Sequence, residues 1–219
     1  MIINLLKSLP NSWNKKPLKK RLCASQEDRI LSWRLDKEYF DGTRAQGYGG
    51  YRYDGRWKPV AMDMIKFYNL KQTSKILDIG CAKGYLLDEF GKILNNTQIY
   101  GIDASSYAII NSNKKIKKNL CIGNATKLPF ENNFFDLVIS INSLHNILNL
   151  YELEAAFKEI NRVSKKKIFI SVGAYDNLKE KKTLDDWAVL SRTYMSTRKW
   201  KAFFKKNSYK GDYYWFKPN

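Results

Sequence analysis

From residue 75 onward, short runs of bulky apolar residues alternate with longer amphipathic segments. The first run, residues 75–79, ends at a glycine, which is typical of a strand buried on both faces of a parallel sheet. We expect strands at residues 75–79, 98–102, 120–122, 135–141 and 167–172, and helices at residues 85–94, 106–117 and 151–163. This alternation predicts an α/β fold with a doubly wound, mainly parallel sheet.

The segments at the two ends follow other patterns. Residues 1–24 are basic and poorly patterned, which suggests a loose arm, and residues 25–40 have the apolar spacing of a helix. Residues 40–57 contain five glycines between aromatic residues, so we expect an ordered loop or a hairpin. A helix to about residue 68 follows, with Pro59 in its first turn. The carboxyl-terminal part predicts helices at residues 183–191 and 197–206 and a strand at residues 212–216.

The composition fits a protein with a hydrophobic core. Of the 219 residues, 44% are hydrophobic, which argues against global disorder. The apolar runs are too short to span a bilayer and the first residues lack a sustained apolar region, so we expect a cytoplasmic protein without a transmembrane segment. Three cysteines without a C-x-x-C pair and a single histidine predict reduced thiols and no bound metal.

The net charge of +18 admits two interpretations. It could mark a surface that binds RNA or DNA. The lysines are scattered along the chain, however, and the sequence is rich in Asn and Ile, as a compositionally biased genome would produce. We therefore favour a general bias, with anionic small substrates or surfaces as partners, over a dedicated nucleic-acid face.

One segment combines a strand, a glycine-containing turn and the start of a helix: Ile76-Leu-Asp-Ile-Gly-Cys-Ala-Lys-Gly84. Glycine lets the backbone approach a ligand closely, and the free N–H groups of a helix start attract negative charge. A dinucleotide fingerprint would need glycine at positions 80, 82 and 85, but Ala82 and Tyr85 occupy two of these positions. The segment therefore does not predict a pyrophosphate site.

The same segment resembles motif I of the class I S-adenosylmethionine-dependent methyltransferases. In that family an acidic residue at the strand end precedes a Gly-x-x-x-Gly turn; here these are Asp78 and the turn from Gly80 to Gly84, with Cys81 and Ala82 inside it. The resemblance implies that this turn wraps the amino acid part of the cofactor, S-adenosyl-L-methionine. It also implies that residues 72–219 form the methyltransferase domain, and that residues 1–71 form an N-terminal extension of basic arm, helices and Gly/aromatic substrate loop.

Two later segments extend the resemblance, which covers about residues 72–172. Asp103 ends the next strand, where a carboxylate can accept both ribose hydroxyls, and the family assigns it that role. Ala104 would then line the adenine pocket. The turn Gly123-Asn124-Ala125 is similar to the adenine-contacting turn of the family, which assigns Asn124 and Ala125 to adenine. The family normally adds two further strands at the end of its seven-stranded sheet; one is evident here, so we expect a sheet truncated at one edge.

The fourth expected strand ends at Ser140–Asn146, and ligands of open α/β sheets bind at the carboxyl ends of strands. Methyl transfer is an in-line displacement that needs a base only when the acceptor carries a proton. We assign catalysis to His145, a candidate base, and to Asn142, and a cofactor contact to Ser140; His145 could instead pack the following helix. The segment lacks the Asn/Asp-Pro-Pro-aromatic pattern of methyltransferases that modify adenine, cytosine or glutamine.

The Gly/aromatic segment supplies the candidates for acceptor recognition. Its arginines could clamp an anionic group, and its aromatic rings could stack on a sugar or a flat ring. The alternative is a loop that packs its aromatic residues over the sheet edge. The assigned residues are Arg44, Tyr48, Tyr51, Arg52, Arg56 and Trp57.

Three functions remain open from the sequence. We favour a methyltransferase that acts on a small polar acceptor, anionic or sugar-like, with oxygen more probable than nitrogen as the methylated atom. The second is an RNA methyltransferase that uses the basic surface, for which binding should weaken steeply with salt. The third is a non-catalytic protein that binds the cofactor and a protein partner.

Overall fold

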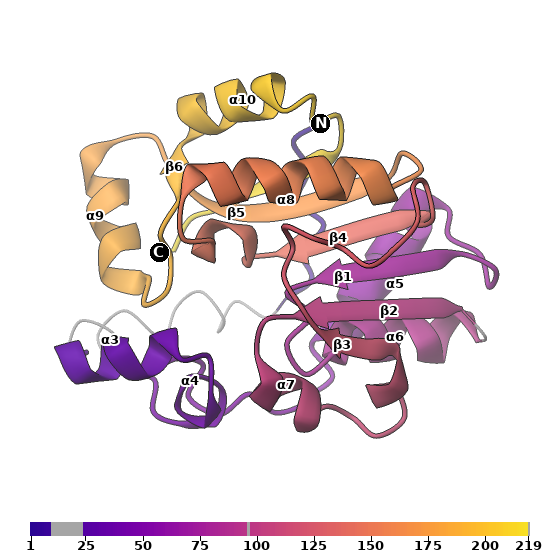
Figure 1. Cartoon of the computed structure of the whole chain (residues 1–219), viewed down its shortest axis with the longest axis horizontal. Coiled ribbons are helices and arrows are strands. Elements are labelled where there is room, and N and C mark those ends of the chain that lie inside the picture. The colour runs from indigo at the N-terminus through magenta and orange to yellow at the C-terminus, as the bar shows by residue number, and fades with distance from the viewer. Residues whose placement is uncertain (10–23, 96, 219) are drawn as a thin grey trace.

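The computed structural model describes residues 1–9, 24–95 and 97–218 (Figure 1). Most of the expected basic arm, residues 10–23, lies outside the described residues. Within the described ranges, no helix is both long enough and apolar enough to span a membrane.

A seven-stranded sheet forms the centre of the molecule (Figure 1). Its strands are β1 (Lys75–Ile79), β2 (Gln98–Asp103), β3 (Leu120–Ile122), β4 (Leu137–Ile141), β5 (Ile168–Tyr175), β6 (Met195–Ser196) and β7 (Asp212–Phe216). The order is β3-β2-β1-β4-β5, and both β6 and β7 pair with β5. Every pairing between these strands is parallel. The doubly wound, mainly parallel sheet expected from the sequence is confirmed.

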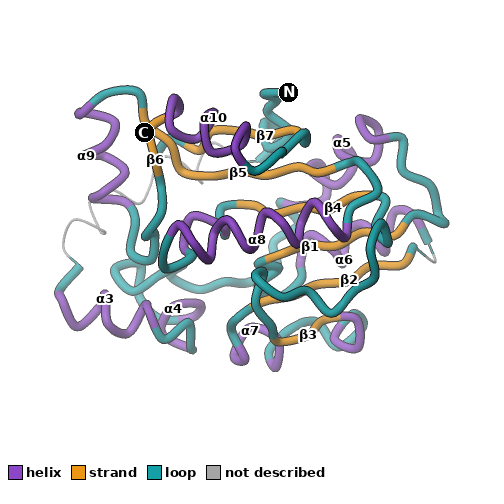
Figure 2. Tube along the Cα trace, turned by 45° about the horizontal axis from the view of Figure 1, so that its top comes forward, coloured by secondary structure: helices purple, strands orange, loops and turns teal. Residues whose placement is uncertain are grey.

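Helices cover both faces of the sheet (Figure 2). α5 (Trp57–Tyr68) and α6 (Tyr85–Leu94) pack on one face, and α8 (Leu150–Val163) and α10 (Thr197–Lys206) pack on the other. Neighbouring strand residues point to opposite layers: Ile76 packs with α5 and α6, and Leu77 packs with α8. Since successive side chains of a strand alternate in direction, this double burial explains why the strands read as continuous apolar runs.

Residues 25–56 of the N-terminal extension lie beside the carboxyl ends of β1 and β2 (Figure 1). Residues 25–40 were expected to form one helix, but they form α3 (Gln26–Trp33) and α4 (Lys37–Asp41). The break falls at Leu35, whose φ of 53° is incompatible with a continuing right-handed helix. Ser25 and Asp36 cap the two helices with their side-chain oxygens. Residues 42–56 form a loop without strand pairing, so of the two expected structures the loop is observed and the hairpin is not.

Two other helices differ in length or position from the expectation. α7 (Ser106–Ile110) is much shorter than residues 106–117, and α9 (Leu178–Trp187) begins before residue 183. Asn111 ends α7, and Asn and Ser side chains there compete with the helical backbone for hydrogen bonds: Ser112 Oγ donates to the carbonyl of Ile109 at 2.7 Å.

The edge beyond β5 is more complete than the expected truncated sheet. β6 has two residues, but β7 pairs with β5 over its full length. The first residues then add to β7, since the N–H of Ile3 donates to the carbonyl of Tyr213 and the N–H of Tyr213 donates to the carbonyl of Met1, both at 2.9 Å. Leu5 and Leu6 are buried in the core. The expectation of a loose arm is therefore wrong for residues 1–6.

The first prediction concerns Trp200, which joins α10 to the sheet. Its side chain is fully buried, and its Nε1–H donates to the carbonyl of Gly173 in β5 at 3.0 Å. Trp200→Ala leaves a large cavity and should lower the free energy of unfolding by about 3–5 kcal/mol in urea denaturation. Tyr151→Ala on α8, where the side chain is 83% exposed, is the matched control and should change it by less than about 0.5 kcal/mol. Similar effects for the two variants would mean that α10 is not part of the core.

Candidate functional site

The turn after β1 has an unusual backbone. Gly80, Ala82 and Gly84 have φ values of 78°, 50° and 76°. A side chain at Gly80 would collide with Ser143, so only glycine fits there. The N–H groups of Gly80 and Cys81 donate to the carbonyl of Ile102 at 2.8 and 3.2 Å, which fixes the turn against β2.

Asp103 ends β2 and lies beside this turn. Its Oδ2 accepts the N–H of Ala82 at 2.7 Å, and its Oδ1 accepts the N–H of Ser105 at 2.8 Å. Burial raises the pKa of Asp103, and the two backbone hydrogen bonds act in the opposite direction. An ionised carboxylate has about four acceptor sites, so about two remain for hydroxyl groups of a ligand.

A first cavity, which we call the nucleoside pocket, opens beside Asp103. Six of the expected cofactor residues line it: Gly80, Ala82, Asp103, Ala104, Asn124 and Ala125. Asn124 holds its own turn, because its Oδ1 accepts the N–H of Thr126 at 3.0 Å. Leu35 and Phe40 of the N-terminal extension close the pocket from the other side.

Two expected cofactor residues line neither this pocket nor the one described next. Ser140 is fully buried, and its Oγ donates to the carbonyl of Ile79 at 2.9 Å, so it joins β4 to β1. Gly84 begins α6, and a side chain there would collide with Ile116 and Leu120. Ser140 and Gly84 therefore contribute to the packing around the turn and do not line either pocket.

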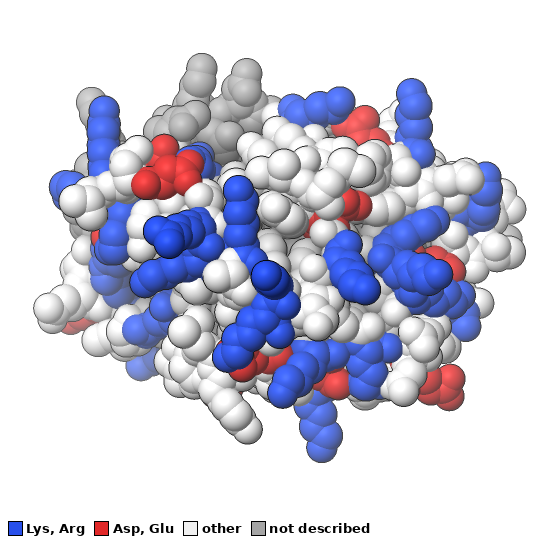
Figure 3. All heavy atoms as spheres, turned by 90° about the horizontal axis from the view of Figure 1, so that it is seen from above, with Lys and Arg blue, Asp and Glu red and all other residues white. Residues whose placement is uncertain are grey.

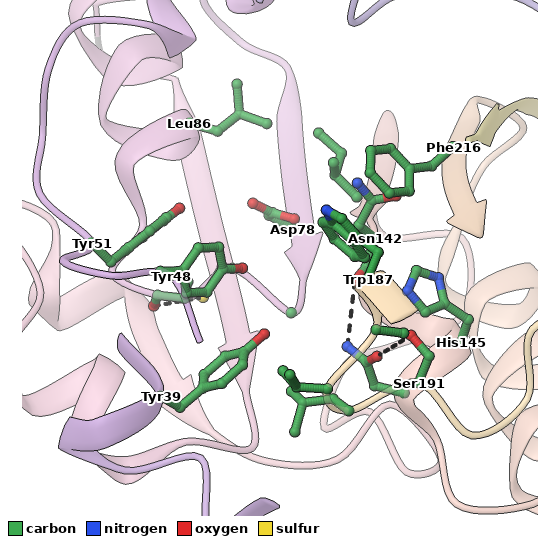
Figure 4. Close-up of a pocket in the computed structure, with 18 of the residues that line it drawn as sticks. Tyr39, Tyr48, Tyr51, Asp78, Leu86, Asn142, His145, Trp187, Ser191 and Phe216 are labelled. Carbon is green, nitrogen blue, oxygen red and sulfur yellow. Dashed lines mark hydrogen bonds between the residues drawn. The ribbon is translucent and has the colours of Figure 1, made fainter. Parts of the chain in front are cut away.

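A second cavity, the aromatic pocket, lies between the N-terminal extension and the ends of β1 and β4 (Figure 4). We define it by its aromatic lining residues: Tyr39, Tyr48, Tyr51, Trp57, Trp187 and Phe216. The expected residues Asp78, Cys81, Asn142, His145 and Arg44 line it as well. Gly80, Ala82 and Asn142 line both pockets, so the two cavities meet between the turn after β1 and the end of β4.

Asp78 is the buried acid of the aromatic pocket. Only 5% of the residue is exposed, and its carboxylate forms no hydrogen bond or ion pair with another described residue. Burial and, to a smaller extent, the charge of Asp103 raise the pKa of Asp78 to about 7. A buried carboxylate without a partner suits a positively charged group of a ligand.

His145 lies on the 3₁₀ turn η2 (Leu144–Asn146) and is buried. Its Nδ1 accepts the N–H of Gly173 at 3.0 Å, and burial lowers its pKa to about 4. A neutral imidazole that accepts at Nδ1 carries its proton on Nε2. His145 therefore offers a hydrogen-bond donor and has no free lone pair with which to act as the expected base.

Asn142 lies where β4 ends, with a φ of 52°. Its Oδ1 accepts the hydroxyl of Ser171 at 2.9 Å, and its N–H donates to the carbonyl of the same residue. The side-chain amide nitrogen is then available as a donor at the junction of the two pockets. Strained, left-handed asparagine is typical of ligand-binding turns.

The three arginines expected to clamp an anion do not act together. Arg44 lines the aromatic pocket, but its Nη1 donates to the carbonyls of Gly47 and Tyr48 at 2.9 and 3.2 Å. Burial lowers the pKa of Arg44. Arg56 pairs with Asp54, and Arg52 is exposed; neither lines a pocket. Tyr48, Tyr51 and Trp57 do line the aromatic pocket, as expected.

A partly buried ion pair that the sequence did not predict attaches the extension to the cofactor turn. Lys83 Nζ lies 2.6 Å from Asp41 Oδ2, and only 7% of the lysine side chain is exposed. Tyr107 donates its hydroxyl to the same carboxylate at 2.8 Å, and the N–H of Tyr51 donates to it at 3.1 Å. This cluster lowers the pKa of Asp41 against the opposing effect of burial.

Residues 187–191 were also missed, because no motif marks them. They line the aromatic pocket at the end of α9. α3 holds this segment: Trp33 Nε1 donates to the carbonyl of Val189 at 3.0 Å, and Arg29 Nη1 donates to the carbonyl of Ala188 at 3.2 Å. The apolar periodicity predicted a helix at residues 183–191, and a helix there gave no reason to expect that these residues line a pocket.

Comparisons with known proteins agree with this geometry. Residues 77–170 match the methyltransferase domain family. An uncharacterized protein of Methanocaldococcus jannaschii is 34% identical over 143 residues, which cover 64% of this chain and 53% of that protein. A demethylmenaquinone methyltransferase of Staphylococcus saprophyticus is 33% identical over 107 residues, 47% of this chain and 45% of the relative. The chain thus spans about half the length of the curated relatives it matches.

A solved structure supports the same fold. Phosphoethanolamine N-methyltransferase 2 of Haemonchus contortus, in complex with phosphomonomethylethanolamine and S-adenosylhomocysteine, matches 87% of this chain and 44% of that chain. The TM-score is 0.55 and the sequence identity is 18%. At this identity the match concerns the fold alone.

The second prediction tests Asp103. Asp103→Asn removes the charge that strengthens hydrogen bonds to hydroxyl groups, so S-adenosylhomocysteine should bind about ten-fold or more weakly in calorimetry. Asp54→Asn is the control, because Asp54 pairs with Arg56 away from both pockets and should leave the affinity unchanged. Unchanged affinity in a folded Asp103→Asn protein would contradict the assignment of the nucleoside pocket.

The third prediction follows from the raised pKa of Asp78, about 7. Between about pH 4 and about pH 7 the folded protein keeps a proton on Asp78 that the unfolded chain has lost, so stability falls as the pH rises and then levels off. His145 opposes this effect over part of the range, because burial lowers its pKa to about 4 and the unfolded chain therefore binds the extra proton. Melting curves without ligand should therefore give a slope of stability against pH that is more negative in the wild type than in Asp78→Asn. Asp54→Asn should retain the wild-type slope, and an unchanged slope in Asp78→Asn would show that Asp78 titrates normally.

Proposed function

We propose that this chain is a class I methyltransferase, which its domain match and its fold support, and that it transfers a methyl group from S-adenosyl-L-methionine to a small acceptor in the aromatic pocket. The observation that carries the proposal is the meeting of the two pockets at Gly80 and Asn142. A nucleoside bound on one side of this junction would present its reactive end to the other side.

The residues present fit this cofactor. The Asp103 carboxylate would accept the ribose hydroxyls, and Asn124 and Ala125 would contact adenine. The turn at Gly80, where a side chain would collide with Ser143, gives the backbone close access to the amino acid part. Asp78 would hold its positive charge, and that charge would lower the pKa of Asp78. When bound, the cofactor supplies a methyl group on a positively charged sulfur.

Positioning and exclusion of water are the contributions of this chain to the transfer. The Lys83–Asp41 ion pair holds the extension over the turn, and Trp33 and Arg29 hold residues 188–189. The acceptor is thereby enclosed, which favours alignment for an in-line displacement. Asn142 and His145 would direct the acceptor atom toward the junction by donating hydrogen bonds.

The geometry supports a small acceptor over a large one. The extension and α9 enclose the aromatic pocket, which leaves room for a small molecule. On the molecular face in Figure 3, Lys and Arg side chains are spread widely, with acidic side chains among them. On that face, such a distribution does not mark a continuous track for a nucleic-acid backbone. An anionic acceptor loses support because Arg52 and Arg56 line neither pocket. We retain oxygen as the favoured methylated atom.

The fourth prediction concerns the product. The protein is incubated with S-adenosyl-L-methionine that carries a labelled methyl group and with fractionated extract of the source cells. We expect label in the small-molecule fraction, and at least about ten-fold less with Asp103→Asn at limiting cofactor. Asp54→Asn should label as the wild type does. Label confined to nuclease-sensitive material would favour the RNA reading, and no label with any fraction would favour a non-catalytic protein.

A further inference from the structure

The acceptor side of the aromatic pocket differs from the cofactor side. Figure 4 shows Phe216, Trp187, His145 and Ser191 across the cavity from the tyrosines of the extension, with Asp78 between the two walls. The rings of Trp187 and Phe216 lie 4.7 Å apart at an angle of 53°. These rings present flat apolar surfaces, which favour a ligand that is itself flat.

The described residues of this wall carry no charge. The charged lining residues of the aromatic pocket, among those described, are Asp78 and Arg44. Asp78 lies in β1, and Arg44 lies in the loop of the extension, where its Nη1 donates to the carbonyls of Gly47 and Tyr48. A phosphate or carboxylate that lies against this wall, away from the reacting oxygen, would meet no cation among the described residues of the wall, so its desolvation would be uncompensated.

Few polar groups on this wall remain for a sugar. The hydroxyl of Ser191 donates to Oδ1 of Asn146 at 3.2 Å, and Nδ2 of Asn146 donates to the carbonyl of Asn142 at 3.4 Å. A sugar ring carries several hydroxyl groups, and each one left without a partner in the pocket would weaken binding. The wall therefore suits a ring with one or two polar atoms.

The state of His145 restricts the chemistry further. Because Nδ1 accepts the N–H of Gly173, the ring donates from Nε2 and does not remove a proton from the acceptor. An aliphatic alcohol would need such a base, since its hydroxyl scarcely ionises near neutral pH. A hydroxyl on an aromatic or enolic ring releases its proton to water more readily, and the oxygen left behind can accept from Nε2–H.

We propose that the acceptor is a flat ring, uncharged apart from an acidic hydroxyl of the phenol or enol type, and that His145 positions its oxygen as a hydrogen-bond donor. This rests on the proposed function. The hydroxyl gives its proton to bulk water before the ring enters the pocket, and an electron pair of the oxygen then forms the bond to the methyl carbon. The carbon–sulfur bond breaks and its electron pair stays on sulfur. The products are a neutral methyl ether and S-adenosylhomocysteine.

The first experiment compares two probes of similar shape, 2-naphthol and 2-naphthylmethanol, in the presence of S-adenosyl-L-methionine. Both carry a flat ring, but only naphthol has an acidic hydroxyl. We expect methyl ether from 2-naphthol, with a rate that rises with pH as the probe ionises, and at least about 100-fold less from 2-naphthylmethanol. Glucose and phosphoethanolamine, as sugar and charged probes, should give no product.

Variants of His145 separate positioning from a structural role. His145→Phe removes the donor and should lower kcat/KM for 2-naphthol about ten-fold, the usual effect of one lost hydrogen bond to a charged oxygen. S-adenosylhomocysteine affinity should not change. His145→Gln restores an N–H donor and should recover most of this loss. Equal losses in both variants, or a loss of cofactor affinity, would contradict the positioning role.

The failure of this proposal can be told apart from failure of the proposed function. If S-adenosylhomocysteine binds and depends on Asp103, but glucose, phosphoethanolamine or 2-naphthylmethanol is methylated in preference to 2-naphthol, the acceptor class is wrong and the methyltransferase assignment stands. The acceptor class is equally wrong if 2-naphthol gives no product while cell extract is labelled. If the cofactor does not bind, both proposals fail.

Discussion

The carboxylate of Asp103 controls how the turn after β1 meets the end of β2. By accepting the N–H of Ala82, it holds a non-glycine residue in the left-handed conformation. The next residue, Lys83, is thereby directed at Asp41 of α4, and this partly buried pair attaches the extension that encloses both pockets. Such a pair contributes more to specificity of arrangement than to stability, because desolvation offsets much of its attraction. The proposed ribose ligand thus also organises the walls of the site.

The inner strands could be predicted because burial on both faces makes them continuous apolar runs, as at Lys75–Ile79, where expected and observed bounds agree. The bounds of the edge strand Leu120–Ile122 agree as well, although Ile122 is exposed. The differences fall where tertiary contacts decide the backbone. Leu35 has no turn signal of its own, yet its left-handed φ divides α3 from α4, and its carbonyl accepts the hydroxyl of Ser105 at 2.5 Å. β6 has two residues and owes its existence to the extended end of β5. Neither contact leaves a local pattern.

The same distinction applies to the site. Residues at the carboxyl ends of strands, such as Asp78, Asp103 and Asn142, could be predicted because parallel strands bring these ends to one edge of the sheet. The sequence could not show which of Arg44, Arg52 and Arg56 lines a pocket, since this depends on the path of an irregular loop. The lining role of residues 187–191 could not be predicted, because α3, more than 150 positions earlier in the chain, holds this segment in place. Long-range packing of this kind cannot be inferred from spacing.

The charge of the surface and the burial inside the site have different effects on ligand binding. A net charge of +18 acts over the surface, where salt screens it within about 10 Å. Inside the aromatic pocket, burial determines the charge of the side chains. It keeps His145 neutral, and Asp78 is the one acid there that has no partner among the described residues. A cationic sulfonium and an acceptor oxygen that has lost its proton attract each other strongly in such a low-polarity space. A site without its own base can therefore still favour transfer, provided that the acceptor is acidic enough to arrive ionised.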